Sequence, residues 1–316
     1  MSTDREQEIS VSVIVPCYNS ERTIRQCLNA ILQQRTSIVF DVTVVDSSTD
    51  ATADIVAREY PMIRLIRSSK RLFAGAARNA GMRATRAPLC LMIDSDCVAA
   101  PDLIDRIVER HGNGSYAAVG GALRNGTPKS LSGLIGYLIE FKEFMPTTPL
   151  RFEKSIPTAN LAYRREALMR FGGFDDDLWM AEDILLNWKM HSAGEQILFD
   201  PKIEVTHINR TGWRTVLSYQ IGLGRMSAEA RRRGGLPGGF LLRQRWLIPS
   251  LPFARTLRAA RWFAAYDKKL LLTFLLIWPL YWLAAAFWAY GFFRGAYPVS
   301  ERKTGTAATD PSPGNS

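Results

Sequence analysis

The chain of 316 residues lacks the residues and motifs that define several common classes of protein. It contains no P-loop, no G-x-G-x-x-G, no G-x-S-x-G and no H-E-x-x-H, which argues against an ATPase, a dinucleotide-binding enzyme, a serine hydrolase and a zinc peptidase. Sixteen Pro and 23 Gly exclude collagen-like or low-complexity character. Its four cysteines show no Cys-x-x-Cys spacing, which predicts reduced, unpaired thiols in a cytosolic domain; they are Cys17, Cys27, Cys90 and Cys97.

Acidic residues are scarce in one part of the chain. Residues 209–303 hold 16 Lys/Arg and 3 Asp/Glu, a net +13, whereas residues 1–208 hold 24 and 26, a net −2. Asp310 contributes the remaining −1 of the total of +10. Because the basic charge is local, it does not indicate a nucleic-acid partner for the chain as a whole.

An uncharged run of 24 residues, Leu270–Phe293, lies within this basic part. As a helix it would be about 36 Å long, enough to cross a hydrocarbon core of about 30 Å, so it predicts a transmembrane helix; a buried helix of a soluble core is the alternative. Residues 1–10 are polar and predict no signal peptide. The positive-inside rule then places the preceding residues on the cytoplasmic side, most simply of a bacterial inner (plasma) membrane.

Residues 240–266 alternate arginines with aromatic residues, which predicts a helix at the membrane interface; a solvated basic face is the alternative. The chain thus divides into five expected parts. They are a polar segment (1–10), a folded domain (11–208), a basic membrane-proximal region (209–269), a transmembrane helix (270–293) and a polar, disordered tail (294–316).

Strand and helix patterns alternate in the first 208 residues. Apolar runs predict strands, and amphipathic stretches predict helices between them. The strands are Val11–Val15, Asp41–Val45, Ile63–Ile66 and Leu89–Ile93, and the helices are 21–34, 51–59 and 74–86. This order predicts an α/β domain with a mostly parallel sheet and flanking helices, in which ligands bind at the carboxyl ends of the strands.

Two aspartates, Asp94 and Asp96, follow the apolar run that ends at Ile93. If the strand continues through them, both carboxylates lie on one face and repel each other unless a cation lies between them. Mg²⁺ or Mn²⁺, which accept oxygen ligands, would suit this site. A solvated turn or a helix cap is the alternative.

Two further sites allow a functional and a structural interpretation. Glu182 and Asp183 begin an amphipathic pattern, where acids commonly cap a helix; near a bound metal complex, one of them could also deprotonate a hydroxyl group. His207 ends the run Ile203–His207, where it is either a structural residue or a further metal ligand.

Several motifs in a fixed order resemble those of the inverting glycosyltransferases of family 2, which have the GT-A fold. The resemblance runs from about Val11 to His207. The motifs are VSVIVPCYN (11–19), DVTVVDSSTD (41–50), GAARNAG (75–81), MIDSD (92–96), PTAN (157–160), GGFD (172–175) and Glu182-Asp183.

The resemblance implies a role for each matching residue. Pro16, Tyr18, Asn19 and Asp46 would bind the nucleotide of the sugar donor. Arg78 would lie near its base or diphosphate. Asp96, assisted by Asp94, would bind Mg²⁺ or Mn²⁺ at the diphosphate, and His207 would add a metal or phosphate contact. Asp183 would be the catalytic base beside Glu182.

The implied activity is inverting transfer of one sugar from a UDP- or GDP-sugar to a membrane lipid or lipid-linked acceptor. The family's usual second acid after strand two is Ser47 here, which leaves the nucleotide open. The Q-x-x-R-W motif of processive members is missing, which favours a single transfer. A sugar-nucleotide-forming nucleotidyltransferase is one alternative, although a Pro-Cys-Tyr-Asn loop after the first strand does not suit a triphosphate. A catalytically inactive membrane scaffold is another.

Overall fold

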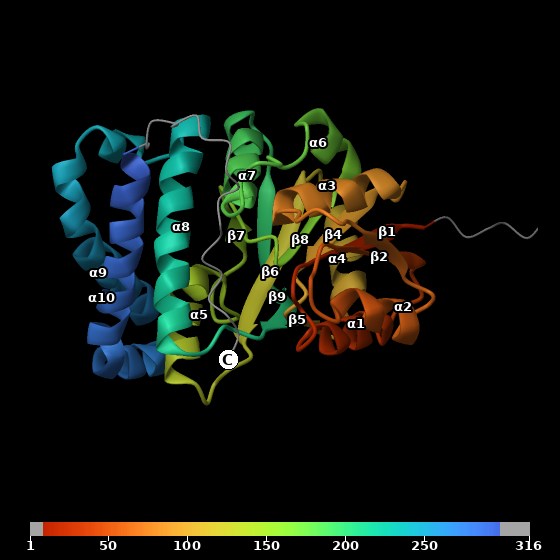
Figure 1. The fold of residues 1–316 in the computed structure, drawn as a ribbon, viewed down its shortest axis with the longest axis horizontal. Coiled ribbons are helices and arrows are strands. Elements are labelled where there is room, and N and C mark those ends of the chain that lie inside the picture. Colours follow the sequence, from red (N-terminus) through yellow and green to blue (C-terminus); the bar gives the residue numbers. More distant parts are fainter. Residues whose placement is uncertain (1–8, 298–316) are drawn as a thin grey trace, which may run out of the picture.

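The computed structural model describes residues 9–297 (Figure 1). A nine-stranded sheet forms the centre, with the strand order β3-β2-β1-β4-β8-β6-β9-β5 and with β7 pairing to β9. The first eight residues and most of the expected polar tail (294–316) lie outside the described residues, so those two expectations stay predictions.

The first half of the sheet is parallel, as the alternating pattern predicts. It contains β1 (Val11–Cys17), β2 (Phe40–Asp46), β3 (Arg64–Arg67) and β4 (Leu89–Ile93). The connecting helices are α1 (Ile24–Leu32), α2 (Thr52–Glu59) and α3 (Ala74–Ala84). All five side chains of β4 are buried, which is why its sequence is an unbroken apolar run. The carboxyl ends of β2, β1 and β4 therefore lie side by side.

The second half of the sheet is mixed. Strand β8 (Asn160–Arg164) runs antiparallel to both β4 and β6 (Ala118–Asn125). Strand β9 (Ile197–His207) is parallel to β6, and antiparallel to both β5 (Cys97–Ala99) and β7 (Arg151–Phe152). The helices of this half are α4 (Leu103–Gly112), α5 (Leu131–Phe141), the 3₁₀ turn η1 (Lys142–Phe144), α6 (Arg165–Arg170) and α7 (Glu182–Ser192).

The C-terminal part forms a layer of helices beside the sheet domain (Figure 1). It contains α8 (Trp213–Gly234), the 3₁₀ helices η2 (Gly239–Leu242) and η3 (Arg245–Ser250), α9 (Leu251–Tyr266) and α10 (Lys268–Ala296). Helix α8, which the sequence analysis did not predict, lies between the domain and α10. Within residues 9–297, α10 is the one helix long and apolar enough to span a membrane.

The C-terminal helices share a hydrophobic core with the sheet domain. Phe263 of α9 and Phe274 and Tyr281 of α10 belong to the same buried cluster as Ile135 and Leu138 of α5. Burial of large aromatic side chains is a dominant stabilising term in such a core. The helices are therefore an integral part of the folded unit.

Candidate functional site

The loops after β1 and β2 are joined by hydrogen bonds at the carboxyl edge of the parallel strands. Asn19 adopts a left-handed backbone with φ 53°, which asparagine tolerates better than most residues. Its Oδ1 accepts a hydrogen bond from the Thr49 amide (2.9 Å), and its own amide donates to Ser48 Oγ (2.8 Å). Asn19 thus fixes the relative position of the two loops that the sequence predicts to bind the nucleotide.

Asp46, at the end of β2, is almost fully buried and accepts hydrogen bonds from its own loop. Its two carboxylate oxygens accept from the Ser48 amide (3.1 Å) and from Ser48 Oγ (2.7 Å). Pro16 and Tyr18 are half-buried nearby, and the Arg71 guanidinium lies 4.3 Å from the centre of the Tyr18 ring. The nucleotide-binding roles of Pro16, Tyr18, Asn19 and Asp46 stay predictions.

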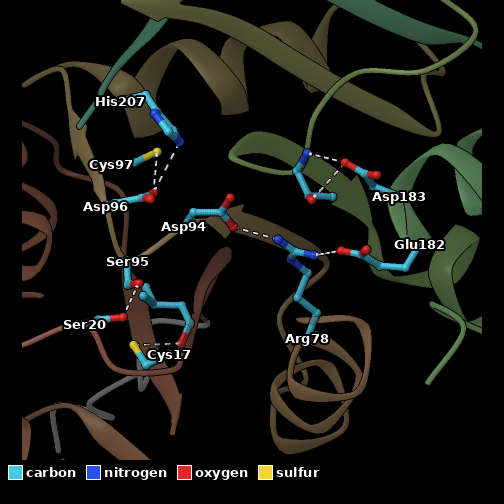
Figure 2. Close-up of polar contacts among 12 residues, drawn as sticks. Cys17, Ser20, Arg78, Asp94, Ser95, Asp96, Cys97, Glu182, Asp183 and His207 are labelled. Carbon is cyan, nitrogen blue, oxygen red and sulfur yellow. Dashed lines mark hydrogen bonds and ion pairs between the residues drawn. The ribbon is translucent and has the colours of Figure 1, made fainter. Parts of the chain in front are cut away.

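Asp94 and Asp96 lie in a turn, so the argument that they share one strand face is wrong. Strand β4 ends at Ile93, and the Cys97 amide donates to the Asp94 carbonyl (2.9 Å), which closes a tight turn. The turn sends the two carboxylates to different partners (Figure 2): Asp94 faces Arg78, and Asp96 faces His207. An apolar run before the aspartates could not distinguish a strand that continues from one that stops.

Asp96, Cys97 and His207 form a cluster of potential metal ligands. Their ligand atoms all lie within 4.8 Å of one another, and Asp94 is not part of the group. Antiparallel pairing of β5 and β9 places Cys97 directly opposite His207. Burial raises the pKa of the Cys97 thiol well above its ordinary value, with Asp96 and Asp94 adding to the effect. The thiol therefore stays protonated, and the oxygen and nitrogen of Asp96 and His207 are the available ligand atoms.

A chain of side-chain amides orients the His207 ring. Asn209 donates through Nδ2 to Asn125 Oδ1 (2.8 Å) and Thr127 Oγ1 (3.0 Å), so its Oδ1 faces His207 Nδ1 (2.9 Å) as an acceptor. A neutral His207 ring then has its proton on Nδ1 and its lone pair on Nε2.

That lone pair points to Asp96 Oδ1, 3.5 Å away. Two acceptor atoms that face each other at this separation would suit a shared cation. An oxygen and an imidazole nitrogen are ligands that Mn²⁺ accepts, and the residues present therefore fit a divalent metal.

Arg78 of α3 joins the two acidic parts of the site (Figure 2). Its buried guanidinium donates to Asp94 Oδ1 through Nη2 (2.6 Å) and to Glu182 Oε1 through Nη1. Burial opposes its charge, but the carboxylates of Asp94, Glu182 and Asp183 outweigh burial and raise the pKa of Arg78. The contact with the nucleotide that the resemblance implies for Arg78 stays a prediction.

Helix α7 begins abruptly and separates the two acids at its start. Ala181, just before the helix, has a φ of 66°, which is strained for a residue with a Cβ atom. Glu182 then points into the protein toward Arg78, where burial raises its pKa and Asp183 adds to the effect while Arg78 opposes it. Asp183 is half-buried, and its carboxylate contacts Thr158 instead of Arg78 (Figure 2).

Asp183 contacts another segment that the sequence analysis singled out. Its Oδ2 accepts from the amide and the hydroxyl of Thr158 (3.2 and 3.3 Å), within the stretch Pro157–Asn160. Thr158 itself is not a predicted site residue. Asp183 is more accessible than Glu182 and is held by neutral donors, so it is the better placed of the two acids to accept a proton.

A group of polar side chains that the sequence did not single out lies beside His207. Arg210 is exposed, its guanidinium lies 4.1 Å from the centre of the Tyr219 ring, and its charge interacts with Asp96 and Glu140. Glu140 accepts a hydrogen bond from the buried Gln220 (2.8 Å). The position of Arg210 three residues after His207 is a local signal for it, whereas Glu140 on α5 has none.

The sheet order, the acidic turn after β4 and the acidic start of α7 define the chain as an α/β protein of the GT-A type. The chain belongs to glycosyltransferase family 2: the family model "Glycosyl transferase family 2" matches residues 12–177. This confirms the family that the sequence motifs resemble.

Curated relatives share between a fifth and two fifths of their aligned residues with the chain. Validoxylamine A glucosyltransferase of Streptomyces hygroscopicus subsp. jinggangensis is 26% identical over 58% of this chain and 52% of its own length. Glycosyltransferase AglE of Haloferax volcanii is 24% identical over 77% of this chain and 81% of its own. The chain spans about half the length, or less, of the first curated relatives that it matches (52%, 48% and 29%).

Solved structures with the same fold cover nearly the whole chain. Mannosyltransferase PcManGT from Pyrobaculum calidifontis, in complex with GDP-Man and Mn²⁺, has a TM-score of 0.63 and 22% identity over 92% of this chain and 88% of its own. TarS 1–349 of S. aureus, in complex with UDP-GlcNAc, has a TM-score of 0.52 and 20% identity over 91% and 90%. At these identities the likeness shows the fold.

Proposed function

We propose that the protein is a metal-dependent, inverting glycosyltransferase that moves one sugar from a UDP- or GDP-sugar to a membrane-associated acceptor. The acceptor is a lipid, a lipid-linked sugar or a polysaccharide precursor. One observation carries the proposal: the Arg78–Asp94 pair lies between the Asp96–His207 cluster on one side and half-buried Asp183 on the other (Figure 2). Complexes of the fold neighbours with GDP-Man and Mn²⁺ or with UDP-GlcNAc support a nucleotide-sugar donor.

The residues of the chain divide the reaction between them. Asp96 and His207 would hold a divalent ion, Mg²⁺ or Mn²⁺, which when bound neutralises charge on the leaving nucleoside diphosphate. The acceptor hydroxyl attacks the anomeric carbon from the face opposite the diphosphate, so the bond to the diphosphate oxygen breaks and the configuration inverts. Asp183 takes the hydroxyl proton as the new bond forms. Arg78 keeps the turn that carries Asp94 and the start of α7 at a fixed separation, which preserves the alignment of donor and acceptor.

The C-terminal helices support a proposal for where in the cell this reaction takes place. The long apolar helix α10 and the basic residues around it attach the enzyme to the inner (plasma) membrane, with the catalytic domain on the cytoplasmic side. A membrane-bound enzyme reaches a lipid-linked acceptor without diffusion through solution.

The test combines product analysis with one conservative variant. Membranes that contain the full chain are incubated with Mn²⁺ and a panel of UDP- and GDP-sugars, and lipid extracts are analysed by mass spectrometry for a mass gain of one sugar. Asp183→Asn keeps the size of the side chain and removes its basicity, so transfer should fall by about 10²-fold or more while nucleotide binding persists. Equal transfer by both proteins would contradict the role of Asp183, and the absence of any sugar product with the whole panel would sink the proposed activity.

A further inference from the structure

Helix α10 is packed against the folded domain along one side only. A Cβ atom on Gly291 of α10 would lie 2.0 Å from the Ile221 carbonyl oxygen of α8, and one on Gly224 of α8 would lie 2.0 Å from the Trp288 carbonyl oxygen. The two backbones are therefore in direct contact. Nearer its start, α10 buries Phe274 and Tyr281 in the core cluster that includes α5.

The opposite side of α10 carries exposed apolar residues, here called the apolar stripe. Its members recur at helical spacing over about 32 Å of helix. They are Leu272 (67% exposed), Leu275 (55%), Leu276 (83%), Leu283 (37%), Tyr290 (50%) and Phe293 (39%). A continuous apolar surface of this length is unusual on a protein surrounded by water and marks a binding face.

Charged residues that lie beside α10, and not beyond its ends, argue against a helix that crosses the bilayer. Helix α9 returns beside α10, so that Phe253 contacts Trp282 (5.4 Å between ring centres). Arg258, one turn further along α9, is 67% exposed and forms an ion pair with Glu143 of the sheet domain (3.0 Å). Because α9 lies along α10 from the Phe253–Trp282 contact, Arg258 lies beside α10 and not beyond its ends, and the sheet domain extends alongside α10 across α8 (Figure 1). A crossing α10 would hold them at the depth of the hydrocarbon core, where charged groups are strongly disfavoured.

The charges around the apolar stripe suit a negatively charged membrane surface. Residues 251–297 contain six Lys/Arg and one Asp, a net +5. Lys268 and Lys269 are exposed at one end of α10, and Arg294 is exposed at the other. An open groove of about 480 Å³ on α9 is lined by apolar residues such as Leu257 and Trp262 and by two arginines, Arg258 and Arg261.

We propose that α10 lies along the surface of an anionic lipid bilayer, with the apolar stripe in the acyl-chain boundary and both helix ends on the cytoplasmic side. This inference rests on the membrane attachment in the proposed function. It replaces the crossing orientation that composition predicts with a surface orientation in which Arg258 and Arg261 stay at the headgroup level. The catalytic domain is then held beside the membrane through α8.

The decisive experiment labels single cysteines in inverted inner-membrane vesicles, whose cytoplasmic face is outside. All four natural cysteines are buried, so an impermeant maleimide has no accessible natural target in the folded chain. The full chain carries Lys269→Cys or Tyr297→Cys at the two ends of α10, and Arg58→Cys on α2 reports the side of the catalytic domain. We expect all three variants to label equally without detergent.

Each other outcome overturns the inference. Labelling of Tyr297→Cys only after detergent would mean that α10 crosses the membrane, and recovery of the chain in the soluble fraction would mean that the stripe does not bind lipid. Sugar transfer is measured on the same vesicles. Two accessible ends without any transfer product would contradict the proposed activity and leave the membrane orientation standing.

Vesicle flotation tests the stripe itself. Purified full-length protein is floated with vesicles of phosphatidylcholine alone or of phosphatidylcholine with phosphatidylglycerol. The double variant Leu272→Gln/Leu276→Gln should partition about tenfold less strongly into the anionic vesicles, because two exposed leucines lose their apolar contact. Met62→Gln, on an equally exposed apolar residue far from α10, is the matched control and should not change partition. Equal partition of the double variant and the wild type would contradict the assignment of the stripe.

Discussion

Arg78 lies between two carboxylates that belong to different parts of the chain, Asp94 after β4 and Glu182 at the start of α7. Arg78 and Glu182 meet where little water reaches, since each is at most 5% exposed, whereas the Asp94 side chain is 32% exposed. A buried carboxylate is tolerated only while a cation compensates it. Arg78 therefore determines the protonation state of Glu182 as well as the position of its side chain.

Replacement of Arg78 by alanine should destabilise the protein by about 3–5 kcal/mol, because it leaves the Glu182 charge buried and unpaired. Burial already raises the pKa of Glu182, and loss of Arg78 should raise it further. A carboxyl group with a raised folded-state pKa binds more protons folded than unfolded, so its stability contribution falls as the pH rises. The pKa of Glu182 is already raised to about 7 with Arg78 present, so the deficit of Arg78→Ala should widen as the pH rises above about 7, as measured by urea unfolding.

Glu182→Gln supplies the control for this prediction. The amide carries no charge, so the double variant Arg78→Ala/Glu182→Gln should recover part of the lost stability and most of the pH dependence. A deficit that stays constant with pH, or that Glu182→Gln does not reduce, would contradict an electrostatic role for the pair.

Asn209 offers a test of the metal site that leaves both candidate ligands in place. Asn209→Ala removes the acceptor that fixes the proton on His207 Nδ1, so the Nε2 lone pair is no longer held toward Asp96. Loss of such an outer partner typically lowers metal affinity about 10- to 100-fold. Calorimetric titration of Mn²⁺ into the protein with UDP or GDP present measures the effect, and Asn113→Ala on the exposed end of α4 is the control. Unchanged Mn²⁺ affinity would contradict the role of His207 as a metal ligand.

At the level of whole elements, the sequence predicts those strands and helices whose position is determined by burial of apolar side chains alone. The apolar run at Leu89–Ile93 matches β4 because a central parallel strand is covered on both faces. The turn at Asp94–Asp96 was an alternative that the sequence could not favour over a continuing strand, because its direction depends on the pairing of β5 with β9, which is remote in sequence. Helix α8 was missed because its buried side is made of small and polar residues such as Gly224 and Gln220, which give no apolar stripe.

Helix α8 also supports the segment that leads to the candidate base. Arg233 pairs with Asp175 (2.9 Å), and from the opposite side Asn79 donates to the Phe174 carbonyl (2.8 Å) and to Asp176 (2.7 Å). Trp179, four residues before Asp183, rests on Gly222 of α8. The segment 174–181 is therefore held between α3 and α8.

Gly222→Ala should disturb this segment selectively. The added Cβ would lie 2.5 Å from the Trp179 ring, so the ring must move and displace the approach to Asp183. We expect sugar transfer to membrane extracts to fall by about tenfold, as a misplaced acceptor side would cause, while hydrolysis of the nucleotide-sugar by water keeps its KM for the donor. Gly112→Ala, where an added Cβ meets nothing within 4 Å, is the control. A parallel loss of donor binding would show that the effect is a general loss of structure.

At the level of the whole molecule, the sequence predicts that the C-terminal helices are a separate membrane anchor. Their packing against α5 predicts instead that the sheet domain needs them to stay folded. Deletion of residues 251–316 would remove Phe263, Phe274 and Tyr281 and expose Ile135 and Leu138 of α5 to water. Each exposed apolar side chain costs about 1.5–3 kcal/mol, which together approaches the whole stability of a domain. The shortened chain should therefore aggregate or unfold cooperatively at a much lower temperature, measured by size-exclusion chromatography and circular dichroism, and mild detergent should not restore a native thermal transition. A monodisperse, folded fragment that still binds UDP or GDP would establish that α9 and α10 are a detachable anchor and that their shared core with α5 contributes little.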